Sequence, residues 1–190
     1  MSCNPSSKPM QAEPIAVAFA NTRSSANRDR IATLADWRAW IDAWTGLRAV
    51  GRRVDADGLG DLLRLRDDIQ SVLRRAARGE RDDTAALDRI VGLADSQPRR
   101  EIRRSAGRPA LAAADGESPS AILGQHLARA TLDVLLTGPD LALCAGRDCR
   151  RVFIATRADR RWCDSAVCGN RARVRAHAAR RRTTRASRIE

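Results

Sequence analysis

Residues 144–168 read CAGRDCRRVFIATRADRRWCDSAVC and hold four of the five cysteines in a chain of 190 residues. Cys144, Cys149, Cys163 and Cys168 stand in a C-x4-C-x13-C-x4-C array. Two cysteine pairs separated by a spacer of hairpin length can bring four thiolates to one point, as a tetrahedral zinc ion requires. Four thiolate ligands leave no position for a catalytic water, so the array predicts one zinc ion with a structural role.

Disulfide bonds are the alternative for four cysteines, and they are typical of small secreted domains. Residues 1–13 contain neither a basic segment followed by an apolar core nor a small-residue cleavage site, so we expect a cytoplasmic protein. In a reducing cytosol, paired cysteines are more often metal ligands than disulfides. Cys3 lies in the polar leader and has no predicted role.

Positive charge is concentrated in and after the cysteine array. The formal net charge is +12, and residues 144–190 contain 14 arginines against four acidic residues. Residues 1–143 are close to neutral, with 21 Lys and Arg against 19 Asp and Glu. This distribution is typical of a polyanion-binding module joined to a near-neutral domain. No apolar run approaches the roughly 20 residues of a membrane span, so we expect no membrane partner.

The residues before the array are patterned mainly as helices. Hydrophobic residues make up 43% of the chain, and most of them are alanine and leucine, which favour helix over sheet. Apolar residues repeat at helical spacing in four segments, at 33–47, 57–77, 82–93 and 118–137. The tryptophans of the first segment lie on or beside its apolar face, and we expect them in the core.

Helix starts and ends can be assigned from individual residues. Thr33 and the pair Ser118-Pro119 are typical first residues, and Asp82 or Asp83 is expected to start the third helix. Gly79 and the pair Gly138-Pro139 are typical ends.

Two segments are ambiguous. The apolar run Ile15–Thr22 fits a short strand or a helical turn. Residues 97–117 contain two prolines and two glycines and lack a convincing strand pattern, although one or two short strands would fit. We therefore predict a mainly α fold, in which the helical N-terminal domain has room for a small β portion.

The cysteine array predicts a treble-clef-like finger. We expect a hairpin built from the strand Arg151–Thr156 and a returning arm at Arg161–Cys163. Cys168 would lie at the start of a basic helix, where backbone amides and the helix dipole favour a thiolate. Phe153 and Trp162 are expected to pack over the metal, and so small a module is expected to fold only when metal is bound.

The sequence around the second cysteine pair resembles the CGNR zinc finger. The resemblance is carried by Arg161-Trp162-Cys163, by Cys168-Gly169-Asn170-Arg171, and by the arginine-rich stretch that follows. The upstream sequence is similar to the start of the ABATE domain, which usually precedes that finger in bacteria. The residues concerned are Phe19-Ala-Asn21-Thr22-Arg23, Leu34, Trp40 and Gly46-Leu47. Because proteins of this kind are described as stress-induced transcriptional regulators, the resemblance implies DNA binding.

This resemblance divides the chain into four parts. They are a flexible leader at 1–13, a helical ABATE-like domain at 14–138, a CGNR-type zinc finger at 139–182 and a basic tail at 183–190. We expect a bacterial DNA-binding transcriptional regulator, with an RNA-binding or ribosome-associated protein as the alternative. A less favoured alternative is an enzyme with its active site in the N-terminal domain and the finger as a targeting device. An enzyme is not expected, because no Ser-His-Asp or Cys-His set, no H-E-x-x-H motif and no phosphate-binding glycine loop occurs.

Arginines in and after the finger are candidate nucleic-acid contacts. Their planar forks suit phosphate oxygens and guanine edges, and a basic helix can enter a groove or follow a backbone. The candidates are Arg160, Arg161, Arg171, Arg173, Arg175, Arg180, Arg181 and Arg182. A solvated tail that binds DNA or RNA nonspecifically is the alternative.

One upstream cluster is a candidate ligand site. Asn21, Thr22 and Arg23 are placed together, and they could bind a small-molecule or stress signal; the alternative is a cap or turn that braces the core. The apolar helix at 119–137 is compatible with internal packing or with a second copy, so a homodimer stays open.

Overall fold

The computed structural model describes residues 13–186 except 82–83 and 106, and the side chains of residue 105 and of residues 182–186 lie outside that description. Cys3 and the end of the basic tail therefore lie outside the described residues. The described chain is mainly helical, as predicted, and its strands form antiparallel pairs. None of the helices described is both long and apolar enough to cross a membrane.

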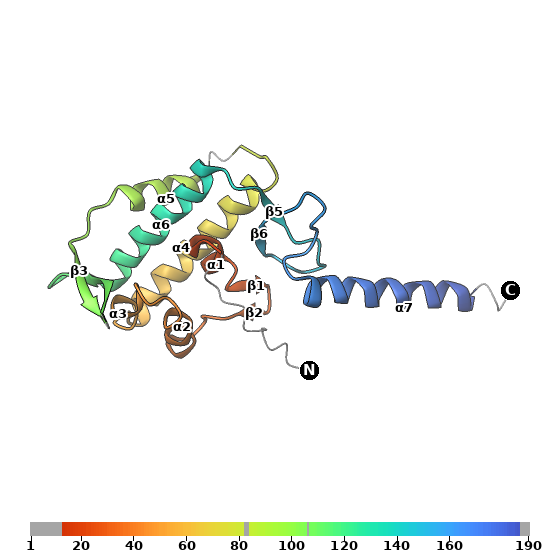
Figure 1. The fold of residues 1–190 in the computed structure, drawn as a ribbon, viewed down its shortest axis with the longest axis horizontal. Coiled ribbons are helices and arrows are strands. Elements are labelled where there is room, and N and C mark those ends of the chain that lie inside the picture. The colour runs from red at the N-terminus through yellow and green to blue at the C-terminus, as the bar shows by residue number, and fades with distance from the viewer. Residues whose placement is uncertain (1–12, 82–83, 106, 187–190) are drawn as a thin grey trace.

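The helices before the cysteine array form one body (Figure 1). In chain order they are α1 (Ile15–Ala20), α2 (Leu34–Ile41), α3 (Arg48–Gly51), α4 (Ala56–Ala76), α5 (Ala85–Asp95) and α6 (Pro119–Thr137). α4, α5 and α6 pack against one another, and α1 packs against α4 and α6. The core of the body lies between these helices.

Helix ends fall where several of the capping residues predict them. The Thr33 hydroxyl accepts a hydrogen bond from the Asp36 N–H at 3.2 Å at the start of α2. Pro119 occupies the first turn of α6 after Ser118, and Gly138 ends that helix in the left-handed conformation with φ of 62°.

The start of α5 differs from the prediction. Thr84 caps this helix, and its hydroxyl accepts from the Leu87 N–H at 3.4 Å. Asp82 and Asp83, the predicted caps, lie outside the described residues. Threonine and aspartate can both cap a helix, so residue type alone does not show which of the neighbouring residues 82–84 is the N-cap.

The ambiguous segment after the leader forms α1. Residues 16–20 are all buried, and a helix covered on every side shows no polar face and hence no helical period in its sequence. The ring centroid of Phe19 lies 6.4 Å from that of Trp37 and 5.7 Å from that of Trp40, and the two tryptophan rings lie 5.5 Å apart. The prediction that the tryptophans of the segment at 33–47 belong to the core is confirmed for Trp37 and Trp40, while Trp44 is half-buried and packs against that core.

A hairpin occupies the segment at 97–117. β3 (Arg100–Ser105) pairs with β4 (Arg108–Ala113), and Gly107 turns between them with φ of 76°. The Leu111 N–H donates to the Gly46 carbonyl at 2.8 Å, which fixes β4 to the loop between α2 and α3. Polar and apolar residues do not alternate along β3, because the described side chains of that strand are exposed on both faces.

The finger follows α6, and its hairpin differs from the predicted one. β5 (Leu141–Leu143) pairs with β6 (Val152–Ile154), so the strands flank the first cysteine pair. The predicted returning arm at 161–163 is not a strand. The prediction was wrong because the apolar residues before Cys144 supply the partner for β6, while the Arg161 carbonyl accepts from the Ala145 N–H at 2.9 Å.

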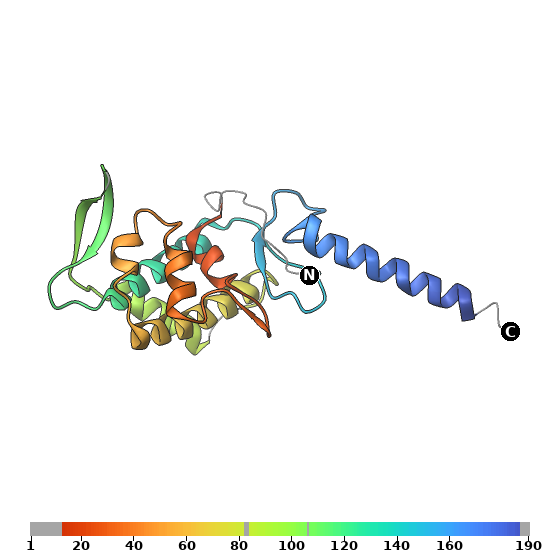
Figure 2. The same ribbon diagram turned by 90° about the horizontal axis from the view of Figure 1, so that it is seen from below.

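The last described segment is a single long helix. A π-helical turn at Ser165–Gly169 leads into α7 (Asn170–Ala186). Figures 1 and 2 show α7 extending away from the body in both views. The helix predicted to begin near Cys168 is therefore present, with Cys168 in the turn that precedes α7.

Candidate metal centre and nucleic-acid interface

The four cysteines of the array converge on one point. Their Sγ atoms all lie within 4.8 Å of one another. The Sγ–Sγ distance is 3.9 Å between Cys149 and Cys163, and 3.7 Å between Cys163 and Cys168. Sulfurs at about 2.3 Å from a tetrahedral zinc ion would lie about 3.8 Å apart. All four cysteines are free rather than paired in disulfides, so the residues present fit a zinc ion.

Two backbone N–H groups donate hydrogen bonds to the sulfur of Cys144. The N–H groups of Gly146 and Cys163 each donate to this sulfur at 3.4 Å, which favours a thiolate over a thiol. A Cβ built on Gly146 would lie 3.2 Å from Cys149 Cβ and 3.4 Å from the sulfurs of Cys144 and Cys168. Glycine therefore lets the chain approach the sulfurs closely.

The π-helical turn places the fourth cysteine. Asp164 accepts from the N–H groups of Ala166 at 2.8 Å and Val167 at 3.0 Å, and this caps the turn that carries Cys168. The Cys168 N–H in turn donates to the Asp164 carbonyl at 2.9 Å. An aspartate directly after the third cysteine was the sequence signal for this cap, and our sequence reasoning did not use it.

Aromatic residues cover the cysteines, as predicted. Phe153 is buried and packs with the cysteines and the half-buried Trp162. A Cβ on Gly169 would lie 3.2 Å from Trp162 Cδ1, so the second residue of the CGNR tetrapeptide leaves room for the indole ring.

Arg160 holds the loop between the two cysteine pairs. Its guanidinium donates to the carbonyls of Ile154 at 3.3 Å, Trp162 at 3.1 Å and Cys163 at 2.8 Å. The same group lies 4.5 Å from the centroid of the Phe153 ring. Arg160 was a candidate nucleic-acid contact, but in this position its donors are engaged inside the finger.

Crowding changes the acidity of the thiols in opposite directions. Hydrogen bonds from the Cys149 and Cys163 side chains lower the pKa of Cys144. Hydrogen bonding to Cys144 and Cys149 raises the pKa of Cys163, and burial raises the pKa of Cys168 to about 11. A cluster without a cation would therefore keep protons on some of its thiols, and a bound dication would displace them.

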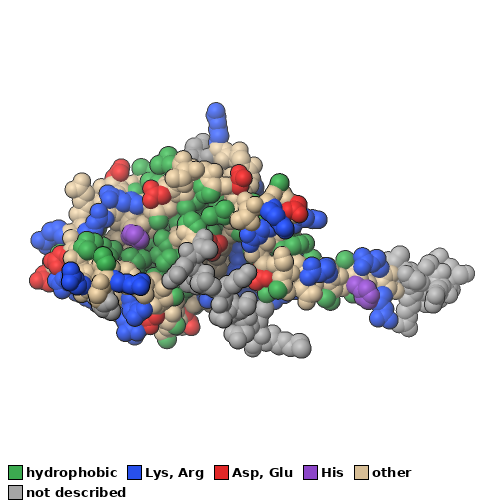
Figure 3. Space-filling view, viewed as in Figure 1, with side chains coloured by type: hydrophobic (Ala, Val, Ile, Leu, Met, Phe, Trp, Pro, Cys, Tyr) green, Lys and Arg blue, Asp and Glu red, His purple; other side chains and the backbone are tan. Residues whose placement is uncertain are grey.

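The other arginine candidates are mostly on α7. Arg171, Arg173, Arg175, Arg180 and Arg181 are exposed, and the side chain of Arg182 lies outside the described residues. Figure 3 shows Lys and Arg side chains along the part of α7 that is coloured. Arg161 is also exposed, and its guanidinium lies 5.6 Å from the centroid of the Trp162 ring.

Comparison with protein families assigns both parts of the chain. The family model described as "Putative stress-induced transcription regulator" (ABATE) matches residues 13–139, more than half of the chain. The chain belongs to the ABATE family. The model for the CGNR zinc finger matches residues 141–181. No curated protein matches the chain significantly.

Both resemblances predicted from the sequence are thus confirmed. The ABATE description and the finger together support a role in regulation, and neither family is described as an enzyme.

Asn21 joins the ABATE domain to the finger. Its Nδ2 donates to the Val152 carbonyl at 2.7 Å, and its Oδ1 accepts from the Val152 N–H at 3.0 Å. Val152 is fully buried and belongs to the core of the ABATE domain. Nδ2 also donates to Glu13 at 3.3 Å, and burial raises the pKa of this carboxyl group.

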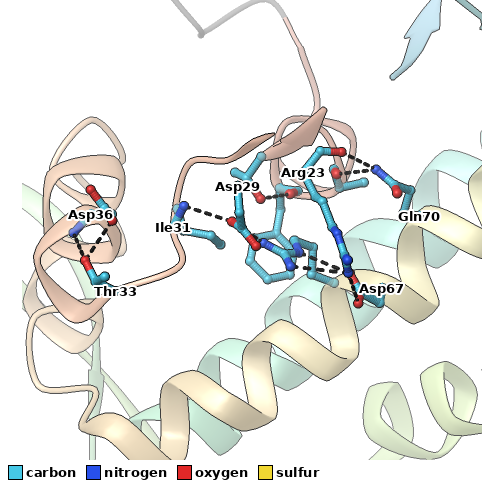
Figure 4. Close-up of polar contacts among 11 residues, drawn as sticks. Arg23, Asp29, Ile31, Thr33, Asp36, Asp67 and Gln70 are labelled. Atoms are coloured by element: carbon cyan, nitrogen blue, oxygen red, sulfur yellow. Dashed lines mark hydrogen bonds and ion pairs between the residues drawn. The ribbon is translucent and has the colours of Figure 1, made fainter. Parts of the chain in front are cut away.

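Thr22 and Arg23, the other members of the predicted ligand cluster, also have partners within the chain. The Thr22 hydroxyl donates to the Phe19 carbonyl at 2.7 Å. Arg23 pairs with Asp67 at 2.6 Å, and its carbonyl accepts from Gln70 at 2.8 Å (Figure 4). These contacts support the alternative that this segment braces the core, because its polar groups are directed at the protein.

A short ribbon after this cluster faces the finger. It consists of β1 (Arg23–Ser25) and β2 (Arg28–Asp29). Asp29 accepts from Arg66 at 2.7 Å and from the Ile31 N–H at 3.1 Å, as Figure 4 shows in part. Burial opposes ionisation of Asp29, but these two bonds offset it, and the pKa of Asp29 lies below its usual value.

The finger also contacts this ribbon and α4 through its backbone. The Arg150 N–H donates to the Ser24 carbonyl at 2.9 Å. Arg74 donates to the Arg150 carbonyl at 2.8 Å. Sequence reasoning did not anticipate this junction, because backbone groups supply one side of each bond and carry no signal in the sequence.

Proposed function

We propose that this protein is a bacterial DNA-binding transcriptional regulator, in which one zinc ion in the CGNR finger fixes the base of α7 and the arginines of α7 bind DNA phosphates. The observation that carries the proposal is the position of α7. This helix of 17 residues projects from the finger and contains no acidic residue (Figure 2).

A structural zinc site at the four cysteines is the first part of the proposal. The ligands would be the two cysteine pairs, Cys144 with Cys149 and Cys163 with Cys168. Bound zinc would hold together the two turns that carry these pairs, which we call the first and second knuckles. The tetrahedral spacing of the sulfurs and the close approach of Gly146 support this assignment. With four sulfur ligands the metal would have no open position, so its role would be structural.

The charge of α7 supports an anionic partner. Arg171 and Arg175 are four residues apart, where like charges on a helix repel each other and destabilise it. Val174 is 60% exposed, and the side chains of α7 that the structure describes, up to Arg181, form no apolar face buried against the body. Phosphates along one side of the helix would neutralise this charge and release condensed counterions, which favours binding.

The dimensions of α7 suit a nucleic-acid groove or backbone. At about 1.5 Å of rise per residue the helix is about 25 Å long, and the DNA major groove of about 12 Å admits one helix. Exposed arginines on several sides allow contact with phosphates on both groove walls. Base contacts would add specificity through arginine forks on guanine.

Competition between nucleic acids tests the proposal against RNA binding. We would load the full chain with zinc and bind it to a fluorescent duplex DNA of mixed sequence. Unlabelled duplex DNA and structured RNA would then compete at two salt concentrations. The proposal predicts displacement by duplex DNA at lower competitor concentration, and affinity that falls steeply with salt.

Substitution on α7 locates the interface. Arg173→Gln should weaken binding and reduce the salt slope by about one unit, because one phosphate contact is lost. Arg38→Gln is the matched control, since Arg38 is exposed on α2, away from the finger. Preferred displacement by RNA, or equal effects of both substitutions, would contradict the proposal.

A further inference from the structure

A cleft lies between the ABATE domain and the finger. Its volume is about 530 Å³, and it is bounded by the β1–β2 ribbon, the first cysteine knuckle and the base of α7. Ser24, Ser25 and Asn27 line the ribbon side with neutral hydrogen-bonding groups. The cleft is thus far larger than a metal site and extends from the cysteines to the ribbon.

Arginines dominate the lining of this cleft. Those from the ABATE domain and the finger are Arg28, Arg30, Arg147, Arg151, Arg171 and Arg175. The acidic residues of the lining are Asp29, Asp148 and Asp164. Asp29 is already bound to Arg66, and Asp164 caps the π-helical turn, so two of these carboxylates are engaged elsewhere.

The cleft arginines lack hydrogen-bond and ion-pair partners among the described residues, although the charge of Arg151 acts on the Glu13 carboxylate. None of the six side chains makes a hydrogen bond or ion pair with the part of the chain that the structure describes. The Nε atom of Arg151 is buried without a hydrogen-bond partner. Arg151 is half-buried and the other five cleft arginines are exposed, so the buried, unpaired Nε of Arg151 is the donor whose desolvation a bound anion would offset.

Two of these arginines also act on each other. Burial lowers the pKa of Arg30, and the positive charge of Arg151 lowers it further. Arg30 belongs to the ABATE domain and Arg151 to the finger, so like charges meet across the domain junction. Glu13, which lies near Arg151, is itself held by Asn21.

We propose that this cleft binds a phosphate group, held by arginines of the ABATE domain on one side and of the finger on the other. Guanidinium forks bind phosphate oxygens through paired charge-assisted hydrogen bonds, and a bound anion would relieve the repulsion between the two domains. The phosphate could belong to a DNA backbone, in which case the site extends the proposed function, or to a free phosphorylated molecule. In either case, binding would couple the ABATE domain to the orientation of α7.

Titration with inorganic pyrophosphate tests the site. The zinc-loaded full chain would be titrated in a calorimeter, and its zinc content would be measured afterwards. Arg28→Gln removes a ligand from the ribbon, and Arg175→Gln removes one from α7. Each should weaken pyrophosphate binding about tenfold, as expected for one lost charge-assisted bond. Arg53→Gln, an exposed position on the ABATE domain, is the control and should bind as the native chain does.

The result that overturns the proposal is an absence of saturable binding, or binding that is equal in all three variants. Thermal unfolding of each variant shows whether it remains folded, and pyrophosphate binding by the folded Arg28→Gln chain at native strength would also overturn it.

A second arm identifies the source of the phosphate. Pyrophosphate is titrated again in the presence of saturating duplex DNA. Competition would support a backbone phosphate in the cleft, whereas unchanged binding would support a free phosphorylated ligand. The two proposals can fail separately. If the chain binds pyrophosphate but no duplex DNA, only the DNA-binding proposal is refuted. If it binds duplex DNA but no pyrophosphate, only the proposed phosphate site in the cleft is refuted.

Discussion

At the scale of single residues, two positions, Asn21 and Gly146, decide how the finger is held. Asn21 takes the place of a second neighbouring strand at Val152, whose strand partner is Leu143, because its amide pairs with both the carbonyl and the N–H of Val152. Gly146 has no side chain, and this lets the chain around the first cysteine pair approach the sulfurs of Cys144 and Cys168 and the Cβ of Cys149. Neither effect depends on charge, so the arginines of this region remain available for other contacts.

Substitution of Asn21 tests the junction between the domains. In Asn21→Ala the buried N–H and carbonyl of Val152 lose their partners, so we expect the free energy of unfolding to fall by about 2–4 kcal/mol. Urea unfolding of the zinc-loaded chain measures this loss. Asn27→Ala, at an exposed position of the ribbon, is the control and should change stability by less than about 0.5 kcal/mol. Equal stabilities for the two variants would rule out the bracing role.

Substitution of Gly146 tests the approach of the chain to the sulfurs. The methyl group of Gly146→Ala would press on Cys149 and on two sulfurs at 3.2 to 3.4 Å, so we expect weaker zinc binding in competition with a chelator. Gly92→Ala is the matched control, because a Cβ there meets nothing within 4 Å. That variant should retain zinc, and it should gain about 0.5–1 kcal/mol of stability from higher helix propensity. Native zinc affinity in Gly146→Ala would refute the argument.

At the scale of elements, the sequence predicts those with a one-sided pattern and misses the others. α2, α4 and α6 have polar and apolar faces and recognisable ends, so their periods and caps are visible. α1 is buried on every side, and the described side chains of β3 are exposed on both faces. Neither segment therefore shows a periodic spacing of apolar residues. The hairpin partner of β6 was misassigned because pairing between strands depends on tertiary contacts. The convergence of the four cysteines, by contrast, followed from their spacing.

We expect α7 to be the element that depends most on the proposed zinc ion. Its described side chains form no buried apolar face, and its first turn begins at the knuckle that carries Cys168. Removal of zinc should therefore reduce helicity by circular dichroism, while the thermal transition of the ABATE domain persists. The reason is that α4, α5 and α6 share a core in which the cysteines take no part. If chelation abolished the thermal transition of the ABATE domain, or left the helicity unchanged, it would contradict the claim that α7 depends on zinc and the ABATE domain does not.

At the scale of the whole molecule, the chain consists of a near-neutral ABATE domain and a strongly basic finger that are joined by hydrogen bonds and a shared core. The finger directs α7 away from the body (Figures 1 and 2). The arginine-lined cleft includes residues at the base of α7. A ligand in the cleft would contact both domains, so we propose that a signal acting on the proposed DNA binding would act at this junction.

The most direct test of the central claim is zinc content and DNA affinity measured on the same preparation, for the native chain and for Cys163→Ser, at two salt concentrations. The account predicts one zinc ion per native chain. It also predicts that Cys163→Ser loses both the zinc and most of the affinity for duplex DNA, because α7 is no longer fixed to the finger. Native DNA affinity in a Cys163→Ser chain that contains no zinc would contradict the account, since the arginines of α7 would then bind as a simple polycation.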